Sequence, residues 1–284
     1  MAKKGGNMVG RLKRRVSVFL NSIGIDPLYL YYILGIGPAT IPKEIKYRLF
    51  GPPDSLPLPP RKLKFLVAGS PWSDHFLELG KECIREITRY LADSGVEISS
   101  FNSILDFGCG CGRVTRHLAA LEKPTIYGTD YNPLLISWCR QNLVFAQFDT
   151  NDLAPPLKYA DNSMGFIFAG SVFTHLDEDL QKAWITELRR VLAPGGFLYF
   201  TTAGEQYLYK LDREQLRSFR SDELVMVNEE SVGRNICLAV EPRRFVEKNL
   251  AEGFEIIKHI PDGARGFGHQ DVYIMKKIQV PEKV

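Results

Sequence analysis

The sequence predicts an α/β fold in which helices cover both faces of a parallel sheet. Between residues 103 and 201, apolar strand-like segments alternate with amphipathic helix-like segments, a pattern that produces parallel sheets. A glycine-rich turn connects the first of these strands to the segment after it, as in many nucleotide-type ligand sites. With 284 residues, of which 45% are apolar and 24% charged, the chain can bury one large core and carry additions to it.

A basic, proline-rich arm, residues 1–64, precedes this pattern. It contains 12 Lys or Arg against 3 Asp or Glu, a net charge of +9, whereas the rest of the chain carries −6. Apolar residues recur at helical spacing between positions 12 and 23, behind basic residues at positions 11–15, and this predicts a basic amphipathic helix. Residues 51–60 contain five prolines and are expected to form an extended connector.

The arm admits three interpretations. We expect its helix to pack on the domain that follows; docking on a membrane surface is the second interpretation and RNA binding the third. The apolar segment at 16–20 is too short for a signal peptide, and residues 27–36 fall short of the roughly 20 residues that a membrane span requires. The five cysteines are odd in number and lack framework spacing, so we expect reduced thiols, a cytoplasmic location and no bound metal.

From residue 73 onward, each element follows from the spacing of the apolar residues. A helix is predicted over 73–91, with Ser73 or Asp74 as its cap. The alternation then predicts a strand at 103–107, a helix at 113–121, a strand at 125–129, a helix at 133–143 and strands at 144–148 and 165–169. The next helix begins at an Asp177 cap and ends before Pro194-Gly195-Gly196, and a strand at 197–201 follows.

Residues 203–240 break the alternation and are interpreted as an insertion that caps the ligand end of the sheet. A short helix is expected at 213–219, with strand-like runs near 224–227 and 236–240. The alternation resumes with a helix at 242–251, a strand at 254–260, a glycine-rich turn at 262–268 and a strand at 271–276.

The most informative segment has the sequence ILDFGCGCGRVTRHL. Its strand ends in Asp106, and Gly108, Gly110 and Gly112 follow at intervals of two. Glycines remove the Cβ atoms that would keep a ribose and a short charged tail away from the backbone. A carboxylate at the end of the strand favours a cationic ligand over a phosphorylated one.

A second carboxylate, Asp130, follows the strand at 125–129 and lies 22 residues after Gly108. It can accept both hydroxyl groups of a ribose, in dinucleotides and in adenosyl compounds alike. Arg113 stands where the dinucleotide fingerprint requires Gly or Ala, and this argues against NAD or FAD.

Three blocks of sequence, in order and at the right spacing, resemble the class I S-adenosylmethionine-dependent methyltransferases. Asp106 to Gly112 match the family's acid-x-Gly-x-Gly-x-Gly motif, with Cys111 where Ser or Thr is usual. Residues 166–177 resemble the fourth strand and its loop, and residues 187–198 the approach to the fifth strand. The resemblance covers about residues 100–202. It implies a Rossmann-like seven-stranded sheet with an antiparallel last strand, a domain over 65–284, and S-adenosylmethionine as the cofactor.

The resemblance also assigns roles at the carboxyl ends of the strands, where ligands of such sheets lie. Asn151 or Asp152 would meet the adenine and Asp130 the ribose, while Asp106, Cys109 and Ser171 would surround the methionine end. The complete set of expected cofactor-binding residues is Asp106, Gly108, Cys109, Gly110, Gly112, Asp130, Tyr131, Asn151, Asp152 and Ser171.

His175 is the candidate catalytic base, because it follows the fourth strand where an acceptor should approach. The alternative is that it only orders the turn before the Asp177 helix or contacts the cofactor. No Asn-Pro-Pro-Tyr-like tetrapeptide follows that strand, which argues against a nucleic-acid substrate. We therefore predict methyl transfer to a small-molecule acceptor, at a hydroxyl of a sugar, lipid-linked or secondary-metabolite substrate. A nicotinamide oxidoreductase and a methyltransferase acting on RNA or protein are the alternatives.

Overall fold

The computed structural model describes residues 37–233 and 237–279. They divide into two compact units, with the boundary between Glu78 and Leu79. The basic helix predicted between positions 11 and 23, and the apolar segment at 27–36, lie outside the described residues. Among the helices that are described, none combines the length and the apolar character needed to cross a bilayer.

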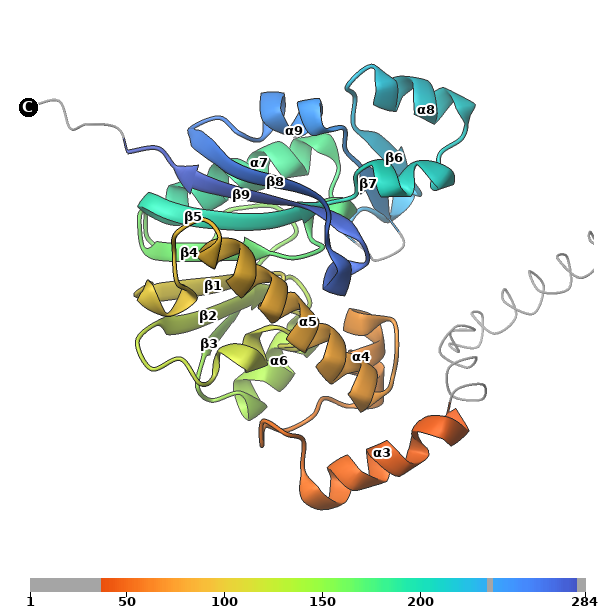
Figure 1. The fold of residues 1–284 in the computed structure, drawn as a ribbon, viewed down its shortest axis with the longest axis vertical. Coiled ribbons are helices and arrows are strands. Elements are labelled where there is room, and N and C mark those ends of the chain that lie inside the picture. The colour runs from red at the N-terminus through yellow and green to blue at the C-terminus, as the bar shows by residue number, and fades with distance from the viewer. Residues whose placement is uncertain (1–36, 234–236, 280–284) are drawn as a thin grey trace, which may run out of the picture. The chain divides into compact units, whose positions relative to one another are not determined.

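The larger unit is built on a seven-stranded sheet with the order β3-β2-β1-β4-β5-β9-β8 (Figure 1). Its first five strands run parallel, and β9 is antiparallel to both β5 and β8. This confirms the seven-stranded, mostly parallel sheet with an antiparallel last strand. The strands are β1 (Ser103–Phe107), β2 (Thr125–Asp130), β3 (Gln147–Thr150), β4 (Met164–Ala169), β5 (Leu192–Thr202), β8 (Phe254–Ala264) and β9 (Gln270–Lys277).

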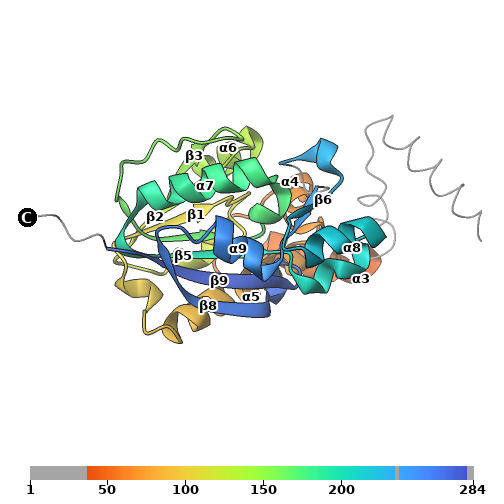
Figure 2. The ribbon, with the colours of Figure 1, turned by 90° about the horizontal axis from the view of Figure 1, so that it is seen from above.

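Helices cover both faces of this sheet, as predicted (Figure 2). On one face, α7 (Glu178–Val191) and α9 (Arg243–Asn249) contribute Trp184, Leu188 and Phe245 to the core. On the other, helix α5 (Ser73–Ala92) contributes Cys83 and Ile87.

Helices α6 (Pro133–Asn142), α7 and α8 (Arg213–Arg220) of the larger unit begin at side-chain caps, the last at Asp212. The predicted cap Asp177 accepts a hydrogen bond from the Leu180 backbone N–H at 2.9 Å, and α7 therefore begins where the sequence indicated. The Asn132 side chain accepts from the Leu134 backbone N–H at 3.1 Å and starts helix α6.

The segment after the glycine turn differs from the prediction. A helix was expected over 113–121, but the structure has a 3₁₀ helix, η3, only at Thr115–Leu118. The Thr115 hydroxyl donates a hydrogen bond to the Asp106 carboxylate at 2.6 Å, and Thr115 and Arg116 are both buried. A side chain that is fixed to the preceding strand holds the backbone in a tight turn, so the amphipathic spacing here does not develop into an α-helix.

Two strand boundaries also differ. The third strand begins at Gln147 instead of 144, and Val144 is exposed, because β3 pairs in register with Tyr127 to Asp130 of β2. The fifth strand begins at Leu192, so Pro194-Gly195-Gly196 lies within β5, where its pairing with β4 shifts register. The helix still ends before these residues, at Val191.

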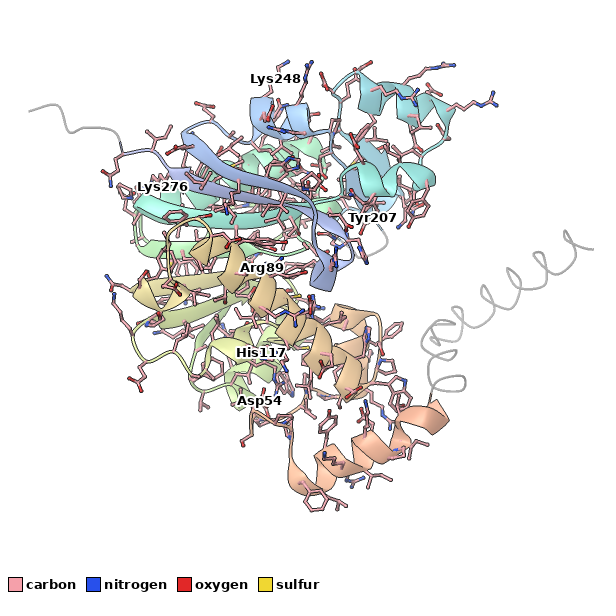
Figure 3. The ribbon with its side chains drawn as sticks, viewed as in Figure 1. Asp54, Arg89, His117, Tyr207, Lys248 and Lys276 are labelled. Atoms are coloured by element: carbon pink, nitrogen blue, oxygen red, sulfur yellow. The ribbon has the colours of Figure 1, made fainter. Side chains whose placement is uncertain are left out.

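The insertion forms a small subdomain with its own apolar core of Leu211, Phe219, Val225 and Val240. It contains η5 (Glu205–Lys210), α8 (Arg213–Arg220), β6 (Val225–Val227), η6 (Glu229–Ser231) and β7 (Leu238–Val240). A bridge between Ala203 and Val240 attaches it to the end of β5. In Figure 3, Tyr207 lies on the insertion, and its hydroxyl donates a hydrogen bond to the Gly268 carbonyl in the turn between β8 and β9.

The smaller unit contributes α3 (Gly37–Phe50), α4 (Arg61–Ala68) and the first residues of α5. Neither α3 nor α4 was predicted, and residue 64, the expected end of the arm, falls within α4. The predicted proline-rich connector joins these two helices without forming a helix or strand of its own.

Helix α5 passes very close to the glycine turn, and this closeness leads to a stability prediction. A Cβ atom on Gly80 would lie 2.3 Å from the Arg113 backbone oxygen, which cannot move aside. We expect Gly80→Ala to lower the free energy of unfolding by about 2 kcal/mol through overpacking, although the same change in an open helix stabilises by about 1 kcal/mol. Urea unfolding measures the change. Lys81→Ala, on the exposed side of the helix, is the control, and an unchanged or more stable Gly80→Ala protein would contradict the expectation.

Candidate active site

The three glycines of the turn all have left-handed backbone conformations. Their φ angles are 78°, 57° and 74° at Gly108, Gly110 and Gly112, a region that favours glycine. A Cβ atom at Gly108 would lie 2.3 Å from Val172 Cγ2, and one at Gly112 would lie 2.4 Å from Leu143 Cδ1. Backbone angle therefore favours glycine at all three positions, and lack of space also favours it at Gly108 and Gly112.

Hydrogen bonds within the protein already use four N–H groups of this turn. Those of Gly108 and Cys109 both donate to the Thr129 carbonyl, at 2.8 and 2.9 Å. The Gly110 N–H donates to Asp130 Oδ2 at 2.9 Å, and the Gly112 N–H to the Cys109 carbonyl at 3.0 Å. A pyrophosphate group is bound through N–H groups that point at it, so this turn suits a ligand without phosphates, such as an adenosyl group.

Asp130 lies at the end of β2 with its carboxylate buried against the turn. Oδ2 accepts from Gly110 and Oδ1 accepts from the Asn132 N–H at 2.8 Å. Burial raises the pKa of Asp130, and these two backbone donors partly oppose that effect. Because a carboxylate has about four acceptor sites, one on each oxygen is left for a further donor such as a ribose hydroxyl.

Asp106 is buried at the end of β1, where it accepts the Thr115 hydroxyl at 2.6 Å. Burial raises its pKa to about 7, although the Thr115 hydrogen bond and the nearby Arg113 guanidinium lower it. A cationic group that approached this carboxyl would favour its ionised form. The negative charge that the sequence predicts at Asp106 is therefore favoured when a cationic ligand is bound nearby.

The other expected cofactor residues lie around Asp130, with different exposures. The Asn151 Oδ1 atom accepts the Thr129 hydroxyl at 2.7 Å, and the Asn151 N–H donates to the Asp130 carbonyl at 3.2 Å. Tyr131 and Asp152 have exposed side chains. Of the two adenine candidates, Asn151 is held directly against the end of β2.

Cys109, expected at the methionine end of the cofactor, lies in the glycine turn with its side chain buried. Its thiol is buried beside Cys139 and the backbone of Gly128, and burial raises its pKa. Only the backbone of Cys109 takes part in the turn's hydrogen bonds to Thr129.

Ser171 belongs to a hydrogen-bonded group that joins three strands, and one member was not predicted. The Ser171 N–H donates to Thr201 Oγ1 at 2.7 Å, and the Thr201 hydroxyl donates to Gln270 Oε1 at 2.6 Å. The Gln270 amide completes the triangle by donating to Ser171 Oγ at 2.9 Å. Gln270 is 99 residues away along the chain and follows a glycine-rich turn, so no local pattern identifies it.

His175 lies in a 3₁₀ turn after β4, with its ring partly buried under the insertion. Nδ1 lies 2.8 Å from the Cys237 carbonyl, and the Gly233 N–H donates to the His175 carbonyl at 2.7 Å. Because a carbonyl only accepts, Nδ1 carries the proton and Nε2 of the neutral ring is a proton acceptor. Burial lowers the pKa of His175, which keeps the ring neutral at physiological pH.

Glu241, which the sequence analysis did not identify, fixes the loop that carries His175. Its Oε1 accepts the Gln181 amide at 2.6 Å, and that amide also donates to the Phe173 and Leu176 carbonyls on either side of His175. Its Oε2 accepts the Ala203 N–H at 3.1 Å, at the end of β5. Burial raises the pKa of Glu241 to about 8, so the carboxyl holds its proton at neutral pH.

The raised pKa of Glu241 predicts that the protein loses stability as the pH rises. Between the unfolded value near 4.5 and the folded value of about 8, the folded protein retains a proton that the unfolded chain has released. We expect the wild type to lose about 2 kcal/mol more than Glu241→Gln between pH 6 and pH 8, as measured by urea unfolding at each pH. Glu255→Gln, which changes an exposed acid on β8, is the control. Equal pH dependence in Glu241→Gln and the wild type would show that the carboxyl is ionised in the folded protein.

Comparison with known proteins finds methyltransferases that are similar to the part of the chain that contains this site. Residues 105–200 match the family model described as "Methyltransferase domain". A fatty-acid O-methyltransferase of Mycolicibacterium smegmatis is 29% identical over 153 residues, which are 52% of this chain and 50% of that protein. A malonyl-[acyl-carrier protein] O-methyltransferase of Halalkalibacterium halodurans is 30% identical over 115 residues, 38% of this chain and 42% of that protein. The chain thus spans half or less of the length of these curated relatives.

Among solved structures, a SAM-dependent methyltransferase from Methanosarcina mazei superposes with a TM-score of 0.48 and 23% identity, covering 63% of this chain and 93% of that one. The residues that match the family model include the glycine turn, Asp130 and the loop that carries His175. Residues 105–200 thus carry a methyltransferase domain, in agreement with the resemblance of the sequence to the class I S-adenosylmethionine-dependent methyltransferases.

Proposed function

We propose that this protein transfers the methyl group of S-adenosylmethionine to an oxygen atom of a small-molecule acceptor. The observation that carries the proposal is the hydrogen bonding of the glycine turn. Four of its N–H groups donate to acceptors within the protein, and the neighbouring Asp130 carboxylate accepts one hydrogen bond on each oxygen, so it has further acceptor sites for a ligand. A nicotinamide dinucleotide would need those N–H groups for its pyrophosphate, whereas an adenosyl group needs none of them. The oxidoreductase alternative is disfavoured for the same reason.

The residues at the strand ends divide the cofactor between them in this proposal. Asp130 accepts the ribose hydroxyls, and Asn151 lies where the adenine is expected, while Tyr131 and Asp152 border that position. Asp106 and Ser171 serve the methionine end, with Cys109 contributing only its backbone.

The cofactor supplies a methyl group on a positively charged sulfur that departs as a neutral thioether. What remains for the protein is to hold the acceptor in line with that methyl group and to accept a proton where the acceptor carries one. His175 Nε2 is the atom to which we assign the proton.

Two kinds of oxygen acceptor are supported by different observations. The neutral, Nδ1-protonated ring of His175 supports a hydroxyl, as on a sugar, lipid-linked or secondary-metabolite substrate, because a hydroxyl must lose its proton. The names of the two curated relatives support a fatty-acid or malonyl carboxyl group instead. A carboxylate is already ionised at neutral pH and needs no base.

Calorimetry and a transfer assay test the proposal. We expect S-adenosylhomocysteine to bind more tightly than NADH. We also expect radiolabelled methyl transfer to at least one member of a panel that contains a free fatty acid, a malonyl thioester, a sugar and a phenol. Tighter binding of NADH, or transfer only to RNA or protein, would overturn it.

A further inference from the structure

Helix α3 of the smaller unit has its amphipathic character reversed. A helix on the surface of a protein normally buries its apolar side chains and exposes its polar ones. In α3, by contrast, Ile41, Ile45, Leu49 and Phe50 are exposed by 46%, 51%, 69% and 80%.

The polar side of α3 is the side that the protein binds. The Lys43 amine and the Tyr47 hydroxyl donate to the two oxygens of the Asp74 carboxylate, at 2.7 and 3.0 Å. The Glu44 carboxylate accepts from the Ser73 hydroxyl at 3.1 Å and also from the Ser73 N–H. These contacts fix the rotation of the helix within its unit, so the exposure of the apolar side is specified by the sequence.

The exposed side chains form a continuous stripe. Ile41, Ile45 and Leu49 are spaced by four residues and therefore span only about 80° of the helix circumference. With 100° of rotation per residue, Lys46 lies next to Leu49 on one side of the stripe, and Arg48 lies next to Ile41 on the other side. An apolar stripe between basic side chains is the arrangement of helices that lie in the interface of a membrane.

A basic cavity adjoins the same helix. It has a volume of about 410 Å³, and its lining includes Arg48, Arg61 and Lys64 as well as Glu44. The Lys64 amine lies 3.7 Å from the Glu44 carboxylate, so Arg48 and Arg61 give the cavity its excess of positive charge, which favours an anionic occupant. The excess of positive charge over residues 1–64 extends the same preference to the rest of the arm.

We propose that α3 docks this protein on anionic phospholipid membranes, with the stripe of Ile41, Ile45 and Leu49 inserted among the acyl chains and the flanking Lys46 and Arg48 beside the lipid phosphates. A bilayer provides an apolar layer beside a layer of negative charge, and this order matches the stripe and its basic flanks. RNA offers the negative charge without an apolar layer. The inference does not depend on the identity of the methyl acceptor.

Co-sedimentation of the full chain with vesicles tests the proposal. We expect binding to vesicles of equal parts phosphatidylcholine and phosphatidylglycerol, and much weaker binding to phosphatidylcholine alone or at high salt. Ile45→Asp/Leu49→Asp is expected to weaken binding at least tenfold by removing apolar contact. Lys46→Glu/Arg48→Glu should also weaken it, by about fivefold for each lost cation.

The control places the same substitutions on exposed apolar side chains of the larger unit. Val144→Asp/Ile278→Asp changes two such residues and is expected to leave vesicle binding intact. Equal binding by the wild type and Ile45→Asp/Leu49→Asp would overturn the proposal, as would an equal loss in the control variant. A wild type that ignores vesicles, but forms a dimer that Ile45→Asp/Leu49→Asp dissociates, would identify a second copy of the chain as the occupant and would also overturn it.

Discussion

Replacing Asp130 with alanine is expected to weaken the binding of S-adenosylhomocysteine at least a hundredfold, a loss of about 3 kcal/mol. The carboxylate provides the acceptors that we assign to the ribose hydroxyls, and its Oδ2 atom also accepts the Gly110 N–H at the centre of the turn. Alanine therefore removes the ligand's partners and leaves a backbone donor of the turn without its own. Isothermal calorimetry measures the affinity.

The control for this experiment is Asp93→Ala, which removes an exposed aspartate at the end of α5. Its affinity should equal that of the wild type. The free energy of unfolding of Asp130→Ala must be measured alongside, because loss of the turn itself would also abolish binding. A folded Asp130→Ala protein with wild-type affinity would contradict both the ribose assignment and the proposed cofactor geometry.

Replacing His175 with glutamine is expected to reduce kcat by about 10² to 10⁴ for a hydroxyl acceptor. Glutamine keeps a donor toward the Cys237 carbonyl but cannot take a proton. The KM for S-adenosylmethionine should change little. For a carboxylate acceptor we expect kcat to remain within a few-fold of the wild type, so the variant also distinguishes the two classes of acceptor.

The pH dependence provides a second measurement of the same role. Burial lowers the pKa of His175 from its ordinary value of 6.5, so the base is available at neutral pH. On a hydroxyl acceptor, wild-type kcat should fall only as the pH drops below that value, and His175→Gln should lack this acidic limb. His269→Gln, which changes an exposed histidine, is the control. An identical acidic limb in His175→Gln and the wild type would assign the titration to another group.

The sequence predicted those elements whose boundaries depend on nearby residues. The strand Ser103–Phe107 has the predicted bounds because its apolar run ends directly at the glycine turn. Helix α7 begins at the predicted cap because an N-cap acts within three residues. The predictions for 113–121 and 144–148 were wrong for a different reason. The first segment is held by the hydrogen bond between Thr115 and Asp106 of the preceding strand, and the bounds of β3 are set by its register with β2.

In the candidate site, too, the sequence identified residues that belong to a local motif and missed residues that act on distant parts of the chain. Asp106, Asp130 and the three glycines lie within a recognisable local motif, and the structure brings them together around one turn. Gln270 and Glu241 act on residues 99 and 60 positions away, and these separations leave no periodic signal in the sequence. Helix α3 was missed because it contains Pro42, a residue that normally interrupts a helix.

The hydrogen bonds that the glycine turn makes within the protein have a consequence for turnover. A loop whose donors waited for a ligand would be loose without it and would have to become ordered at each binding event, at a cost in entropy. Here hydrogen bonds to β2 and Asp130 hold the turn without a ligand. The proposed cofactor can therefore enter, and the spent cofactor leave, without refolding of this turn, so exchange between catalytic cycles need not wait for that loop.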